Sequence, residues 1–167
     1  MLANNKELAE MERKLRLMAE VIEDDDVTCE LFEANEQFAL PTLVTEFPDD
    51  EEGRSRYLLL NFVPLPEGSE YTDFTQFYVE LPFDLTKDDP ATLRGKIDQL
   101  NRVLPLGHCM TLKDRPDLPY RQMAGLRYMY PMPKGQDFNE NTFLETLMVF
   151  LVSYDAAERF FLEGTLE

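Results

Sequence analysis

The chain has 167 residues, with 16 Lys and Arg side chains against 33 Asp and Glu, which gives a formal net charge of −17. This balance argues against nucleic acid and against anionic lipid as the main partner, because both bind to basic protein surfaces. Hydrophobic residues make up 44% of the chain, so a folded core is expected, and the length favours a single domain over residues 1–167.

The cysteine content and the hydropathy of the chain indicate its cellular compartment. Cys29 and Cys109 are the only cysteines, and the first residues turn polar at once, so we expect no secretory signal. No apolar run approaches the ~20 residues that a membrane-spanning helix needs. The sequence therefore predicts a cytoplasmic protein with reduced thiols, with one disulfide as the alternative.

The charge is concentrated in one half of the chain. Residues 1–90 carry 7 basic and 23 acidic side chains, whereas residues 91–167 carry 9 and 10. Acidic clusters fall at 23–26, 49–52 and 88–89, where we expect turns. They are interpreted as solvated loops, or alternatively as an acidic face that selects a basic protein partner.

The first predicted element is an amphipathic helix that ends near Ile22. Its apolar residues recur at spacings of three and four and are Leu8, Met11, Leu15, Met18 and Ile22. Glu10 and Lys14 are expected as an exposed ion pair four residues apart. The apolar stripe is typical of a core face, but it is also a candidate seam for a homodimer.

Four strands are predicted next, because the hydrophobic period changes to two. The expected ranges are Thr28–Ala34, Phe38–Phe47, Tyr57–Val63 and Phe74–Phe83. Alternation in the fourth range indicates a half-buried antiparallel strand. Pro41 indicates an edge position or a bulge in the second range.

A second helix should follow, with Asp89 as its cap, Pro90 in its first turn and Pro105 after its end. Its predicted apolar face is Leu93, Ile97, Leu100 and Leu104. Two more strands are expected, Leu106–Lys113 and Tyr120–Tyr130, before the stretch 131–135 breaks the pattern.

The last predicted element is a helix that starts near Asn139 or Asn141, with Thr142 and Glu145 spaced as a capping box. Its apolar content predicts that it is buried on more than one side, as the main core helix. Together these elements predict an α+β fold, an antiparallel sheet packed by helices in the order α-β-β-β-β-α-β-β-α.

No catalytic, metal or cofactor site is predicted. His108 is the only histidine, and a pair of Cys29 with His108 would require the fold to bring them together. The chain holds three Cys and His residues in total, fewer than the four that a structural zinc site needs. No nucleophile elbow or phosphate-binding glycine loop is present, so the sequence predicts a protein that is not an enzyme.

Residues typical of protein interfaces occur in two segments. The strand 120–130 should place Arg and Met side chains on one face and Tyr side chains on the other. The candidate protein-contact residues are Tyr120, Arg121, Met123, Arg127 and Met129, together with Leu8, Met11, Leu15 and Met18 of the first helix. In the alternative, the apolar members form core and the arginines neutralise the acidic half.

Three short segments carry a resemblance to a known family. They are Leu100-Asn101-Arg102-Val103-Leu104-Pro105-Leu106-Gly107, Leu118-Pro119-Tyr120-Arg121 and Phe143-Leu144-Glu145-Thr146-Leu147. Over roughly residues 90–165 the chain resembles the YbjN-like family, described as bacterial sensory transduction regulators, with a type III secretion chaperone-like fold. The resemblance implies a homodimer with a chaperone-like or regulatory role and no catalytic residues. The chain departs from the secretion chaperones in having four predicted strands before the second helix, where they have three.

The leading hypothesis is a non-enzymatic domain that binds an amphipathic or partly unfolded polypeptide segment. The alternative is a regulatory module that docks a folded basic protein through its acidic N-terminal half. A third hypothesis, a small-molecule binding domain or an unrecognised enzyme, requires an enclosed cavity with convergent polar groups.

Overall fold

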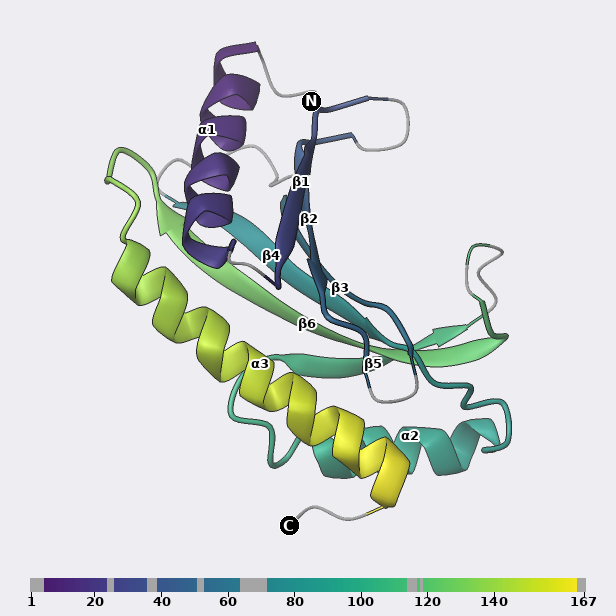
Figure 1. The fold of residues 1–167 in the computed structure, drawn as a ribbon. Coiled ribbons are helices and arrows are strands. Elements are labelled where there is room, and N and C mark those ends of the chain that lie inside the picture. The colour runs from purple at the N-terminus through teal and green to yellow at the C-terminus, as the bar shows by residue number, and fades with distance from the viewer. Residues whose placement is uncertain are drawn as a thin grey trace. The chain divides into compact units, whose positions relative to one another are not determined.

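The structure is a computed structural model that describes residues 5–23, 26–35, 39–50, 53–63, 72–113, 117 and 119–164. Its elements are α1 (Asn5–Ile22), β1 (Thr28–Phe32), β2 (Thr42–Phe47), β3 (Arg56–Phe62), β4 (Thr72–Leu81), α2 (Pro90–Leu100), β5 (His108–Lys113), β6 (Gln122–Pro133) and α3 (Glu140–Glu163). The predicted α+β class and element order are confirmed (Figure 1).

The strands form a six-stranded antiparallel sheet in the order β1-β2-β3-β4-β6-β5. The register pairs Leu43 of β2 with Leu60 of β3, and Cys109 of β5 with Leu126 of β6. Because β1 and β5 are the end strands, each has one edge without a neighbouring strand among the described residues.

The chain groups into two compact units. Unit 1 comprises Met1–Phe77 and Met129–Glu145, and unit 2 comprises Tyr78–Tyr128 and Thr146–Glu167. Three elements, β4, β6 and α3, therefore contribute residues to both units.

In unit 1, α1 packs on β1, β2 and β3 (Figure 1). The predicted apolar stripe is core at its C-terminal end, where Leu15 and Met18 are 0% exposed and Ile22 is 9% exposed. Lys14 is also buried, which corrects the expected exposed pair with Glu10: its Nζ lies 3.9 Å from Asp73 Oδ2 and 4.0 Å from Glu10 Oε1. The exposed partner of Glu10 is Arg13, through two hydrogen bonds of 2.8 and 2.9 Å.

An aromatic cluster completes the core of unit 1. The ring of Phe143 packs edge-on against Phe77 and Tyr130, with centroids 5.8 and 5.9 Å apart, and Phe77 stacks on Tyr130. These edge-to-face and stacked arrangements add to the free energy gained from burial alone. They fix the first turn of α3 against β4 and β6 in this unit.

In unit 2, α2 begins as predicted. The Asp89 carboxylate accepts hydrogen bonds from the N–H groups of Ala91 and Thr92, and Pro90 stands in the first turn. The predicted end was wrong: α2 ends at Leu100 and Asn101 is its C-cap, so Leu104 lies outside the helix. The cause is the Asn101 side chain, which turns to the backbone of β5.

The boundaries of all six strands differ from the prediction, by one or two residues in β1, β3, β4 and β5 and by more in β2 and β6. β2 begins at Thr42, after Pro41, while Phe38 lies outside the described residues. β6 begins at Gln122 and continues through Pro133, so the prolines do not break the strand as predicted. Both Pro131 and Pro133 are exposed, whereas Met132 between them is buried and its Sδ accepts a hydrogen bond from Thr75.

The third helix corrects two predictions. Its N-cap is Asn139, one of the two expected positions, because Asn139 Oδ1 accepts the N–H of Thr142; Thr142 is therefore inside the helix rather than its cap. The helix is also buried on one side only. The buried side is Phe143, Leu147, Phe150, Tyr154, Ala157 and Phe160.

Candidate protein-binding surfaces

The structure separates the predicted contact residues into buried and accessible ones. Leu15 and Met18 are fully buried, and Met123 is 2% exposed beside Leu112, its register partner. The accessible members are Tyr120, Arg121 and Arg127, which are exposed, and Leu8, Met11 and Met129, which are half-buried. The expected Arg and Met face of β6 is therefore not a continuous surface, because Met123 is core.

The apolar surface that sequence reasoning missed lies on α3. In unit 2, Met148, Val149 and Val152 are 55%, 42% and 54% exposed. Spacings of three and four place them on one face of the helix, here called the α3 apolar face. Leu144 precedes Met148 by one turn and is 42% exposed. The sequence carries a signal for this face, the high apolar content of the helix, which by itself predicts burial on more than one side rather than an exposed apolar surface.

The segment before β5 lies next to α3. The backbone N–H of Leu106 donates to Ser153 Oγ at 3.0 Å, and that hydroxyl donates in turn to the carbonyl of Val149. Gly107, with φ of 88°, fits closely here, since an added Cβ would lie 3.3 Å from the Phe150 ring. These contacts fix the helix while leaving the α3 apolar face uncovered by any described residue.

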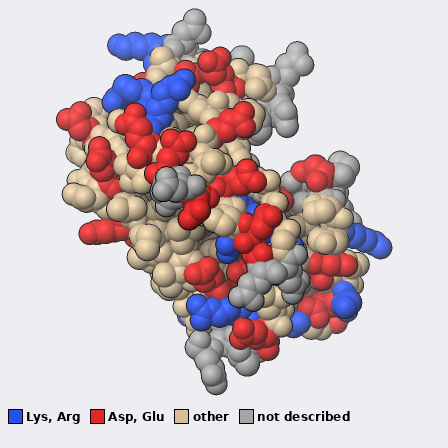
Figure 2. All heavy atoms as spheres, in the orientation of Figure 1, with Lys and Arg blue, Asp and Glu red and all other residues tan. Residues whose placement is uncertain are grey.

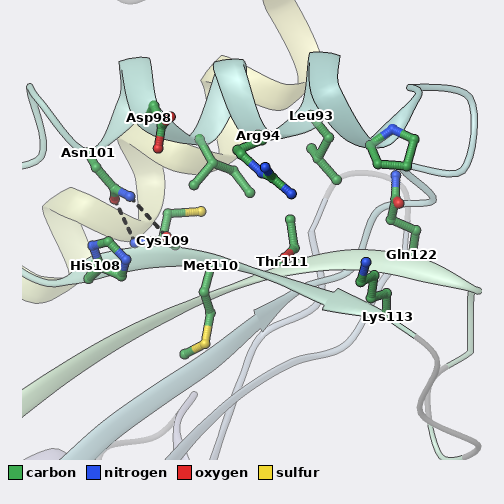
Figure 3. Close-up of a pocket in the computed structure, with 12 residues that line it drawn as sticks. Leu93, Arg94, Asp98, Asn101, His108, Cys109, Met110, Thr111, Lys113 and Gln122 are labelled. Carbon is green, nitrogen blue, oxygen red and sulfur yellow. Dashed lines mark hydrogen bonds between the residues drawn. The ribbon is translucent and has the colours of Figure 1, made fainter.

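A pocket of about 150 Å³ opens between α2 and β5 in unit 2 (Figure 3). It is lined by Pro90, Leu93, Arg94, Ile97, Asp98, Asn101, His108, Cys109, Met110, Thr111, Lys113 and Gln122. Leu93 and Ile97 are buried at its helix side, and the Gln122 amide is fixed by hydrogen bonds to the carbonyls of Leu85 and Asp88. We call it the α2–β5 pocket.

One side chain of this pocket binds the outer edge of β5. Asn101 Nδ2 donates to the carbonyl of Cys109 at 3.0 Å, and Asn101 Oδ1 accepts the N–H of Cys109 at 2.7 Å. The two bonds reproduce what a neighbouring strand would make with one residue. The Cys109 side chain points toward α2 (Figure 3), and burial raises the pKa of its thiol to about 12.

Two cationic side chains line the α2–β5 pocket without a carboxylate partner. Arg94 extends from α2 toward β5 (Figure 3), and Lys113 ends the strand; both are exposed. In the described part of the chain neither makes an ion pair, whereas nearby Lys96 is held by Asp88 at 2.7 Å. This is unusual in a chain with twice as many acidic as basic residues.

Several acidic side chains are engaged in local structure. Asp89 caps α2, Asp88 binds Lys96, and Asp50 binds Arg54 at 2.5 Å. Figure 2 shows Asp and Glu side chains at many places on the visible face, with Lys and Arg side chains among them. The clusters at 24–25 and 51–52 lie outside the described residues.

The residues considered for catalysis lie on the two end strands of the sheet. Cys29 is on β1 in unit 1, where its Sγ lies 3.3 Å from Thr45 Oγ1, and His108 is on β5 in unit 2. Desolvation raises the pKa of the Cys29 thiol. The thiolate is the nucleophilic form, so Cys29 is less reactive at neutral pH than a solvent-exposed cysteine. Among the described residues no group of three or more His, Cys, Asp or Glu is placed to hold a metal ion.

Comparison with family models, with curated proteins and with solved structures found no match to this chain. Within the described segments, no helix is both long enough and apolar enough to cross a membrane. The resemblance to the YbjN-like family thus stays a prediction.

Proposed function

We propose that this chain is a non-enzymatic, cytoplasmic protein-binding domain, chaperone-like or regulatory, that captures an amphipathic segment of another protein on the α3 apolar face. The observation that carries the proposal is the exposure of Met148, Val149 and Val152 on one side of a helix whose other side is core. A cluster of exposed apolar side chains is a typical docking surface, and methionine adapts to different partner shapes.

The experiment uses two labelled amphipathic peptides with the same leucine face, one with lysine and one with glutamate on its polar face. Apolar capture predicts that both peptides bind and that their affinity changes little between about 50 and 500 mM salt. Salt weakens interactions between charges, over a screening distance of about 10 Å at 0.1 M, but it does not weaken the burial of apolar surface. The alternative, docking of a basic partner by the acidic half, predicts binding of the lysine peptide alone and a steep loss with salt.

Substitutions locate the surface. Met148→Gln with Val152→Thr keeps side-chain size but removes the apolar contact, and we expect at least a tenfold weaker affinity for both peptides. Arg159→Gln, exposed on the same helix, is the matched control and should bind as the unmodified chain does. Unchanged binding by the double variant would contradict the proposal.

A homodimer remains part of the proposal. Because Leu15 and Met18 are buried, we propose for it an interface other than the α1 stripe. Light scattering at low micromolar concentration should then give twice the 19.5 kDa chain mass. A dimer that dissociates in the Met148→Gln, Val152→Thr variant would identify a second copy as the occupant of the α3 apolar face. A clean monomer would remove the homodimer from the proposal.

A further inference from the structure

We propose that the α2–β5 pocket is a second binding surface, which takes an extended acidic peptide segment as an added strand on the free edge of β5. The inference goes beyond the α3 apolar face and does not depend on it. It combines three features of unit 2: a strand edge and two cations that have no partner among the described residues, and a pocket that suits one side chain.

The free edge follows from the bonds of Asn101. Because Asn101 binds both the N–H and the C=O of Cys109, the main chain of Cys109 faces away from β6. Main-chain groups alternate along an antiparallel strand, so those of Thr111 and Lys113 face the same way. In the described part of the chain neither residue makes a hydrogen bond outside the β5–β6 ladder. These groups form a template for a further strand.

Asn101 also sets the limit of this edge. Its amide occupies the position that a ligand main chain would take opposite Cys109. The segment open to a ligand therefore runs from Thr111 to Lys113. This length pairs with only a few residues of an extended peptide. This arrangement protects part of the edge from unselective pairing while leaving the part beside the cations open.

Charge complementarity identifies the ligand as acidic. The side chains of Thr111 and Lys113 alternate with that of Met110 and belong to the face that carries Cys109, toward α2. A ligand side chain on that face meets the Arg94 guanidinium and the Lys113 ammonium. Guanidinium groups bind carboxylates through two parallel hydrogen bonds. The carboxylate of Asp98 lines the same pocket, and it adds repulsion that the two cations must outweigh.

The volume fits a side chain rather than a metabolite. Small-molecule sites span about 300–1,000 Å³, and a water molecule takes about 30 Å³ of liquid volume. The α2–β5 pocket, at about 150 Å³, accommodates a group the size of a glutamate side chain. The strand edge would supply the affinity, and the pocket would select the carboxylate.

The test measures fluorescence anisotropy with two labelled seven-residue peptides, one alternating valine and glutamate and the other valine and lysine. We expect the glutamate peptide to bind at least tenfold more tightly. Arg94→Gln and Lys113→Gln should each weaken it severalfold and together at least tenfold. Arg102→Gln removes an exposed cation that follows Asn101 in the sequence and does not line the pocket, and it is the matched control, with binding unchanged.

Thr111→Pro separates strand addition from simple anion binding. The N–H that it removes faces outward, so the β5–β6 ladder keeps its bonds, and proline is tolerated on such an edge. We expect this variant to lose peptide binding while its circular dichroism spectrum is unchanged. Should it fail to fold, amide exchange in the unmodified chain replaces it: the N–H groups of Thr111 and Lys113 should exchange more slowly with peptide bound.

Several results would overturn the inference. They are equal affinity for the two peptides, unchanged binding in the Arg94→Gln, Lys113→Gln variant, and absence of binding at about 1 mM peptide. Equally tight binding of glutarate to the unmodified chain and to the Thr111→Pro variant, with no preference for the peptide, would assign the pocket to a small dicarboxylate. If the Met148→Gln, Val152→Thr variant loses the amphipathic peptides but still binds the valine-glutamate peptide, the result bears on the proposed function and not on this pocket.

Discussion

Asn101 shows how one side chain can define both a helix end and a strand edge. As C-cap it ends α2, and its amide satisfies the N–H and C=O of buried Cys109. The sequence placed Asn101 in a motif of the family resemblance but within a helix predicted to reach Leu104. Periodicity could not reveal this role, because the bond partner is a backbone eight residues away.

Replacing Asn101 should destabilise the chain. Asn101→Ala leaves two main-chain groups of an otherwise buried residue without a protein partner, and we expect a loss of about 1–3 kcal/mol in the free energy of unfolding. Urea titration followed by circular dichroism measures it. Gln99→Ala, exposed near the end of the same helix, is the control and should stay within about 0.5 kcal/mol. Equal stability of the two variants would show that water replaces the amide.

Cys109 makes stability depend on pH in the alkaline range. Its pKa is raised from the ordinary 9.0 to about 12 by burial, so the folded chain keeps the proton that the unfolded chain loses. The stabilisation is complete below pH 9 and falls as pH rises from 9 toward 12, by up to about 1.4 kcal/mol per pH unit. Comparing urea midpoints of the unmodified chain and Cys109→Ala over this range tests it. All other ionisable groups are common to the two proteins. If the urea midpoints of the two therefore fall in parallel as pH rises, the loss of stability does not come from Cys109.

At the scale of elements, patterning predicted most of the fold. The apolar spacing of α1, the cap and proline of α2 and the alternation of β4 are local signals. Each predicted its element in the right place along the chain, although α2 ends earlier than predicted and β4 is shifted by two residues. The predictions that were wrong depend on distant contacts. Lys14 is buried because β4 supplies Asp73, and β6 continues through two prolines because Met132 between them packs inward. The exposed face of α3 was missed for the same reason, since composition does not show which side meets a neighbour.

Two identical substitutions in unit 2 should have opposite effects. An alanine Cβ at Gly125 of β6 would lie 3.1 Å from Leu112 Cδ1 and 3.3 Å from the carbonyl oxygen of Val79, so Gly125→Ala should cost about 1–3 kcal/mol. At Gly95 of α2 no heavy atom lies within 4 Å, and alanine favours helix by about 0.5–1 kcal/mol. Thermal unfolding of both variants is the measurement. A stabilised Gly125→Ala chain would show that β6 can shift away from Leu112.

At the scale of the whole molecule, the net charge of −17 acts on stability as well as on binding. Self-repulsion among like charges destabilises a compact state, and salt reduces it. Part of the acidic excess is neutralised locally, at Glu10 with Arg13 and at Asp73 with Lys14 and Lys134. The charge asymmetry between the halves was fully predictable. That Arg94 and Lys113 have no carboxylate partner in the segments the structure describes was not, because only the fold shows which charges are paired.

The two units should unfold in a single transition. The elements β4, β6 and α3 each supply residues to both units. If one unit unfolded alone, the shared strands and helix of the other unit would be disrupted as well. The chain has no tryptophan, so tyrosine emission and far-ultraviolet circular dichroism are the two probes, and their urea curves should coincide. Leu60→Val in unit 1 and Gly125→Ala in unit 2 should each shift the whole curve. Two transitions, with each variant moving only one, would show that the units are independent folding domains; the binding surfaces of unit 2 could then be studied on a shorter chain.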